Sequence, residues 1–273
     1  MALIHHVVTG QARPSVLRPI VFVHGFACAH SDWDAQVAQL SPRHQTVAVD
    51  LRGHGASPGT PEQCSIERYG ADVAELLGAL DLSGVVLVGH SMGCRVVTEA
   101  ALQAPGRIGG VILVDGSQFT PAMEPVLRER FATAEGYAAT MEGLFKDMFT
   151  ASSDPKTVQA VVARARLLPR AIGEKMLTDL LRYDVTRFTA SLACLRMPVM
   201  ALQTTYSNEK RERSTMQTGQ SSPFLDMIHF CLPAARIEII ADTGHFPQLD
   251  QAARTNEVIG EFLGSLPSSR TVA

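Results

Sequence analysis

The chain has 273 residues, of which 46% are hydrophobic and 19% are charged. A chain of this length and composition can bury a sizeable core, which excludes an intrinsically disordered protein and suits one large domain or a core with one insertion. The formal net charge of -3 argues against nucleic acid or an anionic membrane as the main partner.

The remaining composition indicates a soluble protein. Five cysteines are scattered without a C-x-x-C pair, as in proteins of a reducing compartment. The N-terminal residues lack the long apolar run of a secretory signal, and no apolar window of about 18 residues could span a membrane. The basic run at 210–213 is interrupted by Glu212 and is expected to be a solvated face. We expect a cytoplasmic location, and the sequence leaves a homodimer open.

Strand and helix patterns alternate in the first part of the chain. Continuous β-branched and aliphatic runs predict buried strands at 19–24, 46–50, 85–89 and 110–115, with a weaker candidate at 5–8. Apolar residues at helical spacing predict the intervening helices at 33–40, 66–80 and 91–104. Repeated strand–helix units of this kind predict an α/β fold with a mostly parallel, doubly wound sheet and helices on both faces.

This alternation stops after the strand at 110–115. Helical patterns without a convincing strand follow at 126–134, 136–149, 156–168 and 172–181. Strands return at 198–202 and 236–240, and a closing helix is expected at 256–263. The pattern therefore predicts a core formed by residues 1–116 and 196–273, with a helical cap inserted at 117–195.

The pentapeptide Gly89–Gly93 (GHSMG) follows a predicted buried strand and opens a predicted helix. A sharp strand-to-helix turn holds its central serine in a strained conformation, and glycines on both sides avoid clashes. Ser91 would then present its hydroxyl at a helix N-terminus, where negative charge is stabilised. Ser91 is the candidate nucleophile, although a plain glycine-rich turn with a capping serine has the same pattern.

His245 is the best candidate among nine histidines for the base that a serine nucleophile needs. It lies in the segment TGHFP, just after the last predicted strand, and therefore at the same edge of the sheet as Ser91. The imidazole of His90 is expected to point away from the Ser91 hydroxyl, and His24 and His54 are expected to form structural hydrogen bonds.

The other histidines give no sign of a metal centre. Four of them are expected at the surface or in packing roles: His5, His6, His44 and His229. No two histidines have a convincing ligand spacing with a carboxylate, so we expect neither a metal site nor a cofactor.

Two backbone amides are candidates for an oxyanion hole. The N–H of Met92 is one natural donor, and the N–H of Phe26 in the loop after the first buried strand is the other. Gly25 would allow that loop to approach a substrate closely. A tight turn without a catalytic role would have the same local sequence.

The motifs HGF at 24–26, DLRGHG at 50–55, GHSMG at 89–93 and GHFP at 244–247 occur in a characteristic order. With these motifs the sequence resembles the α/β-hydrolase family from about Ile20 to Leu263. The resemblance implies the α/β-hydrolase fold, with the serine before the histidine in the chain. It implies much less about the substrate, because this fold serves many chemistries.

The sequence departs from the family at the acid that completes the catalytic triad. Many relatives carry an aspartate shortly after the strand that corresponds to 198–202, but residues 203–210 here contain none. Asp115 ends an earlier strand where some relatives place their acid, although loop hydrogen bonds could also explain it. Glu209 lies in the usual loop, about two residues late. Between these two candidates we favour Asp115. Asp242 and Asp250 are set aside, because positions so near His245 in sequence rarely give the required in-line geometry.

These residues predict hydrolysis of a small-molecule carboxylic ester, in which Ser91 attacks the acyl carbon and His245 accepts its proton. An apolar cap favours small to medium hydrophobic substrates. The apolar residues of the cap that could contribute are Phe119, Met123, Phe131, Met141, Leu144, Phe145, Met148 and Phe149.

Other functions share the same residues. A lactonase, a carbon–carbon bond hydrolase and a cofactor-free perhydrolase use the same triad, and a weakly catalytic small-ligand sensor of this fold is a further alternative. Ser91 at the nucleophile position disfavours a dehalogenase or epoxide hydrolase with an aspartate nucleophile.

Overall fold

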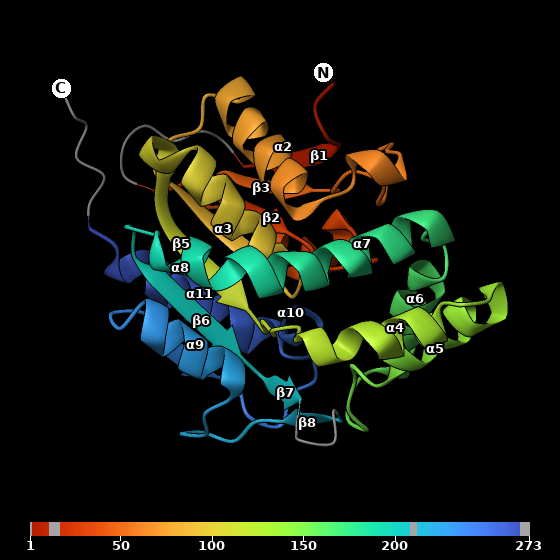
Figure 1. Ribbon diagram of the computed structural model, residues 1–273. Coiled ribbons are helices and arrows are strands. Elements are labelled where there is room, and N and C mark those ends of the chain that lie inside the picture. Colours follow the sequence, from red (N-terminus) through yellow and green to blue (C-terminus); the bar gives the residue numbers. More distant parts are fainter. Residues whose placement is uncertain (1, 11–16, 208–211, 268–273) are drawn as a thin grey trace.

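A seven-stranded sheet forms the centre of the molecule, which the computed structural model describes at residues 2–10, 17–207 and 212–267. The strands lie in the order β1-β3-β2-β4-β5-β6-β9 (Figure 1). In chain order they are β1 (His6–Thr9), β2 (Ile20–Val23), β3 (Thr46–Val49), β4 (Val85–His90), β5 (Ile108–Val114), β6 (Val199–Gln203) and β9 (Arg236–Ile239). Strand β1 pairs antiparallel with β3, and the pairs from β3 to β9 are parallel. The predicted α/β fold with a mostly parallel sheet is confirmed.

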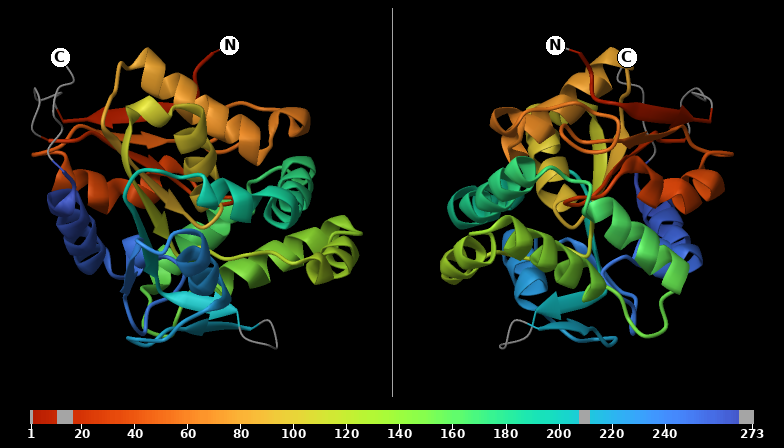
Figure 2. Two further views of the ribbon diagram at one scale, coloured as in Figure 1. Left: turned by 60° about the vertical axis from the view of Figure 1, so that its left-hand side comes forward. Right: turned by 90° about the vertical axis from the view of Figure 1, so that its right-hand side faces the viewer.

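Helices cover both faces of this sheet. Every residue of β2, β3 and β4 is buried, as expected for parallel strands that are apolar on both sides. Val21 and Val23 face one cluster of core residues, whereas Phe22 stacks on Trp33 in the other cluster. The helices on the Val21 face are α2 (Ile66–Ala79) and α3 (Gly93–Gln103), and those on the Phe22 face are α1 (Asp34–Leu40) and α11 (Ala252–Ser265) (Figure 2).

Residues 117–195, which connect β5 to β6, contain helices and turns but no strand. The α-helices are α4 (Glu124–Arg130), α5 (Ala134–Lys146), α6 (Pro155–Ala165), α7 (Arg170–Tyr183) and α8 (Thr189–Ala193), with a π-helical turn at Asp184–Phe188. Each helix predicted in this segment overlaps one of α4 to α7, which group on one side of the molecule (Figure 1). No helix in the described ranges combines the length and the apolar character that a membrane crossing requires.

A buried ion pair joins this helical segment to helix α3. Arg95 of α3 donates through Nε and Nη2 to the carboxylate of Asp184, at 2.9 and 2.5 Å, and both side chains are almost inaccessible to solvent. Arg95 also donates to the carbonyls of Ser91 and Ser117. These two bonds pair further N–H groups of the buried guanidinium, which reduces the cost of burying its charge.

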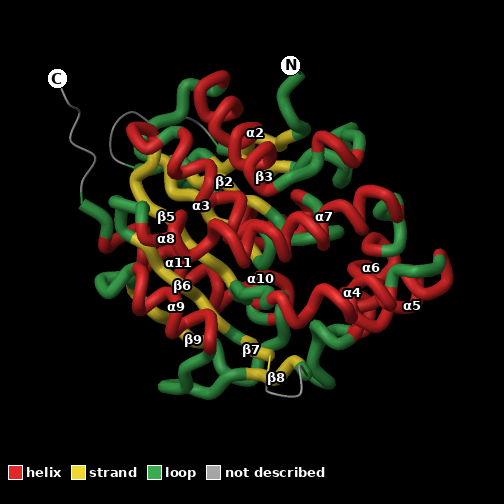
Figure 3. Tube along the Cα trace, viewed as in Figure 1, coloured by secondary structure: helices red, strands yellow, loops and turns green. Residues whose placement is uncertain are grey.

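Two features after β6 were not predicted. Strands β7 (Thr205–Ser207) and β8 (Arg213–Thr215) form a small antiparallel sheet at the lower edge of the molecule (Figure 3). Strands of three residues are too short to produce a recognisable alternation. Helix α9 (Pro223–Cys231) is also missing from the prediction, although Ser222 caps it by accepting a hydrogen bond from the Leu225 amide and Pro223 occupies its first position.

Candidate functional site

Ser91 occupies a sharp turn between β4 and α3. Its φ of 54° lies in the left-handed region, which a residue with a side chain adopts only under strain. A Cβ atom at Gly89 would lie 2.3 Å from the Gly93 carbonyl oxygen, and one at Gly93 would lie 2.6 Å from the Val23 carbonyl oxygen. Only glycine fits on either side of Ser91, which is the reason the turn needs the G-x-S-x-G pattern.

The loop after β2 lies directly against this turn. A Cβ atom at Gly25 would be 3.1 Å from the Cβ of Ser91, so the loop backbone approaches the serine as closely as a glycine allows. The next residue, Phe26, and the residue after the serine, Met92, are both buried. Among the described residues, neither of their amide N–H groups donates to a protein acceptor. Both amides are therefore available to a ligand beside Ser91.

Asp115 and His245 lie in contact. Oδ2 of Asp115 is 2.5 Å from Nδ1 of His245, although 130 residues separate them in the chain. Oδ1 of Asp115 accepts hydrogen bonds of 2.7 Å from the amides of Thr204 and Thr205, and Oδ2 accepts one of 2.6 Å from the Thr205 hydroxyl. The structure thus brings together the two side chains that the sequence pairs. The alternative acid, Glu209, lies outside the described residues.

The hydrogen bonds keep Asp115 ionised despite its burial. Burial alone would raise its pKa, but the hydrogen bond from His245 and the positive charge of Arg213 outweigh burial and bring the pKa below its ordinary value. Because an ionised carboxylate only accepts, Nδ1 of His245 must carry the proton. The lone pair of that imidazole is then on Nε2, which has no hydrogen-bond partner in the described part of the chain.

The backbone on both sides of the His245 ring is fixed as well. Its amide donates to the carbonyl of Met148 at 2.7 Å, and its carbonyl accepts a 2.7 Å hydrogen bond from Nε2 of His90. A Cβ atom at Gly244 would lie 2.7 Å from the same Met148 carbonyl oxygen, so this approach requires glycine. Burial and the nearby charge of Arg213 together lower the pKa of His245 to about 4, although the hydrogen bond with Asp115 acts in the opposite direction. The imidazole is therefore neutral near pH 7, as a base must be.

Arg213 is the functional-site neighbour that sequence reasoning missed. Its Nη1 donates to the Thr205 hydroxyl at 2.6 Å, lies 3.1 Å from Nδ1 of His245 and lies 3.7 Å from Oδ2 of Asp115. The expectation that the run at 210–213 is a solvated face is wrong for this residue, whose side chain is only 20% exposed. The pairing of β7 with β8 brings Arg213 back toward Thr205, and no local sequence pattern predicts this hairpin.

The other histidines near the turn have structural roles, as predicted. His24 accepts from the Leu51 amide through Nε2 and donates to the Gly25 carbonyl through Nδ1. His54 bonds the Arg52 carbonyl. Burial lowers the pKa of His24 to about 3 and that of His54 to about 4, so both are neutral at physiological pH.

The carboxylates closest to His245 in sequence serve other groups. Asp242 accepts a hydrogen bond from the side chain of Gln217, and Asp250 accepts one from the Ser153 hydroxyl. Their roles agree with the expectation that neither faces the imidazole.

The apolar residues of the helical segment divide into packing residues and residues near His245. Four of them are buried in the core: Phe131, Met141, Phe145 and Met148. Phe149 stacks on Phe246, the residue after His245, with ring centroids 5.0 Å apart. A cavity of about 540 Å³ is lined by α4 and α7, including Leu177 and Leu181, and none of Ser91, Asp115 and His245 lines it.

The chain matches the model of the alpha/beta hydrolase family over residues 20–258, and it belongs to this family. An uncharacterized protein of Mycobacterium tuberculosis is 27% identical over 264 residues, which cover 89% of this chain and 74% of that protein.

Solved structures with similar folds carry several activities. A thermophilic esterase from Thermogutta terrifontis has a TM-score of 0.79 and 23% identity, and the match covers 96% of this chain and 93% of that one. An enol-lactonase from Burkholderia xenovorans has a TM-score of 0.77 and 19% identity, with 96% of each chain covered. At these identities the likeness shows the fold alone.

Proposed function

We propose that this protein is a serine hydrolase that cleaves carboxylic esters of small to medium hydrophobic substrates through an acyl-enzyme on Ser91. The observation that carries the proposal is the hydrogen bond between Nδ1 of His245 and Oδ2 of Asp115. It fixes the tautomer in which Nε2 is free to accept the Ser91 proton. A histidine in a purely structural role would not need a buried carboxylate on one nitrogen and an unbonded second nitrogen.

In the first half-reaction, Oγ of Ser91 forms a bond to the acyl carbon while its proton passes to Nε2 of His245. The electron pair of the carbonyl moves to its oxygen, where the Phe26 and Met92 amides stabilise the negative charge. When the carbonyl re-forms, the bond to the alcohol oxygen breaks, and His245 returns the proton to the leaving alcohol. Asp115 stabilises the transient imidazolium.

In the second half-reaction, water attacks the acyl carbon on Ser91. His245 accepts the proton of the water and then donates it to Oγ, which releases the carboxylic acid and restores the enzyme. We propose that residues 117–195 act as a cap. The contact between Met148 and His245 supports this assignment, because it brings the helical segment to the base.

The direct test is turnover of short-chain p-nitrophenyl esters by the purified protein. Wild-type protein should release nitrophenol over many turnovers, and Ser91→Ala should lose at least about 1000-fold in kcat. Ser117→Ala is the matched control, because Ser117 contributes only its backbone carbonyl to Arg95. It should retain activity.

Covalent labelling locates the nucleophile independently. A fluorophosphonate should add one mass equivalent to wild type at the peptide that contains Ser91, and none to Ser91→Ala. Turnover that survives in Ser91→Ala would overturn the mechanism. Multiple turnover on lactones with none on esters would move the substrate class to lactones, and single-turnover chemistry alone would favour the ligand-sensor alternative.

A further inference from the structure

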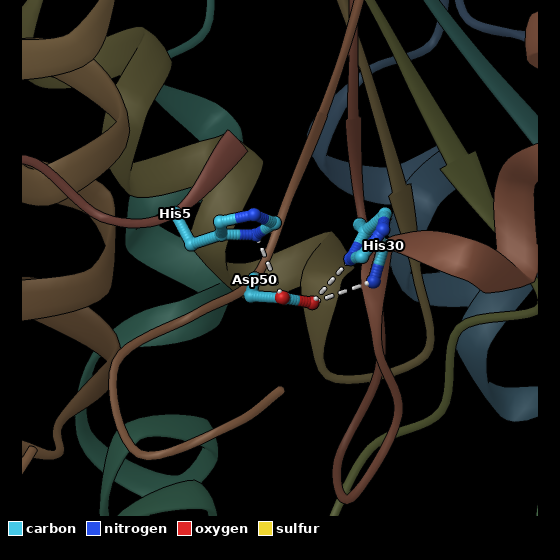
Figure 4. A group of neighbouring side chains, drawn as sticks. All are labelled: His5, His30 and Asp50. Carbon is cyan, nitrogen blue, oxygen red and sulfur yellow. Dashed lines mark hydrogen bonds and ion pairs between the residues drawn. The ribbon is translucent and has the colours of Figure 1, made fainter. Parts of the chain in front are cut away.

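His5, His30 and Asp50 come together at the end of β3, two strands along the sheet from Ser91. Nδ1 of His5 lies 2.9 Å from Oδ2 of Asp50, and Nδ1 of His30 lies 3.0 Å from Oδ1 (Figure 4). Both rings face the carboxylate. Because the three residues come from the segment before β1, the loop after β2 and the end of β3, no sequence motif joins them.

The spacing of these atoms suits a shared metal ion. The ligand atoms of His5, His30 and Asp50 all lie within 4.8 Å of one another. Nitrogen and oxygen ligands bind zinc at about 2.0–2.2 Å, which places neighbouring ligand atoms of one ion roughly 3 Å apart. The two nitrogen–oxygen distances already have this value. In the described part of the chain, no other group of three such residues meets the same criterion.

The carboxylate is held in place by the backbone around it. The His30 amide donates to Oδ1 at 2.8 Å and the Ala56 amide donates to Oδ2 at 2.9 Å. Such donors fix the orientation of a ligating carboxylate, and the two imidazole nitrogens occupy its remaining positions in the absence of an ion. The side chain of Asp50 is 1% exposed, whereas those of His5 and His30 are 38% and 29% exposed. An ion can therefore enter from the histidine side and keep water ligands there.

We propose that His5, His30 and Asp50 bind one divalent transition-metal ion of the zinc class. Two imidazole nitrogens and one carboxylate favour zinc, nickel or copper over magnesium or calcium, which prefer all-oxygen sites. On binding, each ring coordinates through Nδ1 and its proton moves to Nε2 by exchange with water, so each imidazole stays neutral. The ion links three segments of the chain, and this role goes beyond the proposed ester hydrolysis.

The test is zinc binding by untagged protein that has been treated with a chelator and then freed of it. Calorimetry should show one ion per chain, and cobalt should give a visible absorption band when it replaces zinc. His5→Gln and His30→Gln should each weaken binding at least tenfold, because losing even an outer-shell partner costs about 10–100-fold. His6→Gln is the matched control, since its Nδ1 bonds the Ile4 carbonyl outside the cluster. It should bind like wild type.

Thermal unfolding gives a second readout. Zinc should raise the midpoint of wild type and His6→Gln but not of His5→Gln or His30→Gln, because an ion that binds only the folded state stabilises it. Equal affinities in all four proteins, or no binding by wild type at millimolar zinc, would overturn the proposal. Neither readout uses ester hydrolysis, so this proposal and the proposed function can fail separately.

Discussion

Nη1 of Arg213 lies 3.1 Å from Nδ1 of His245, which is also the nitrogen that is hydrogen-bonded to Asp115. Since Nδ1 already donates to the carboxylate, Arg213 acts on the imidazole through its positive charge. That charge disfavours the imidazolium and helps to hold the pKa of His245 at about 4. Arg213 is thus a positioning residue that extends the pH range in which the proposed base is neutral.

Replacing this cation should move the acid limb of the pH profile. Arg213→Gln should raise the pKa of His245 and shift the lower limb of kcat/KM upward by about one pH unit, a modest effect for a charge at contact distance. Ester turnover measured from pH 4 to 8 checks this. Arg213→Lys keeps the charge and should leave the limb near that of wild type. An unchanged limb in Arg213→Gln would show that the charge does not reach the imidazole.

Asp115→Asn should abolish most activity while preserving the fold. The new Oδ1 can still accept from the Thr204 and Thr205 amides, but its amide nitrogen would face Nδ1 of His245 and donate to it. The imidazole would then carry its proton on Nε2 and could not accept one from Ser91. We expect a fall in kcat of about 10⁴-fold.

The control for this substitution is Asp242→Asn, because Asp242 flanks His245 in sequence and bonds Gln217 instead. Asparagine also tolerates the φ of 55° at this position. Stopped-assay kinetics on both variants measure the loss of kcat, and circular dichroism checks that both variants are folded. Comparable losses in the two variants would contradict the role of Asp115.

Breaking the buried pair of Arg95 and Asp184 should destabilise the fold. Asp184→Ala leaves an uncompensated cation beneath the helical segment, which costs about 3–5 kcal/mol of unfolding free energy. Urea unfolding of wild type and variant measures this difference in unfolding free energy. Glu257→Ala, which removes a partner of Arg254 at the surface, should cost less than about 1 kcal/mol. Joint replacement by Arg95→Met and Asp184→Leu should recover part of the lost unfolding free energy. If Asp184→Ala lowered the unfolding free energy as little as Glu257→Ala, the buried pair would be unimportant for stability.

Stability should fall as the pH drops from about 6.5 to 4. The pKa values of His24, His54 and His245 lie at about 3, 4 and 4 in the folded protein, against 6.5 for an ordinary histidine. Within this window the unfolded chain binds protons that the folded chain excludes, so acid favours unfolding. Each histidine contributes up to about 1.4 kcal/mol per pH unit. Urea unfolding across this range should give a shallower slope for His54→Gln, whereas constant stability of the wild type would contradict neutral buried histidines.

The local geometry of the site can be predicted from the sequence more fully than the contacts between distant segments. Gly89, Ser91 and Gly93 were identifiable because a steric requirement within five residues dictates their order. The choice of the triad acid could be narrowed to Asp115 and Glu209, because the sequence shows only which carboxylates follow a predicted strand. The charge pattern around Arg213 predicts a solvated surface, which is wrong because its contact with His245 depends on a hairpin of two three-residue strands.

The same limit applies to the helical segment and to the cluster at Asp50. Helices α4 to α7 were predictable because their apolar residues recur at helical spacing. The cluster of His5, His30 and Asp50 was not predictable, because β1 and the loop after β2 bring distant parts of the chain beside β3. Side-chain chemistry that depends on several segments becomes visible only in three dimensions.

The hydrogen bond from the His245 amide to the Met148 carbonyl has a mechanical consequence. Lifting residues 146–149 away from the sheet must first break this bond and unstack Phe149 from Phe246. Such a movement would free the His245 backbone amide, whereas the imidazole would keep its hydrogen bond to Asp115. Movement of residues 146–149 away from the sheet is thus coupled, through one hydrogen bond and one ring stack, to the backbone of the residue proposed as the base.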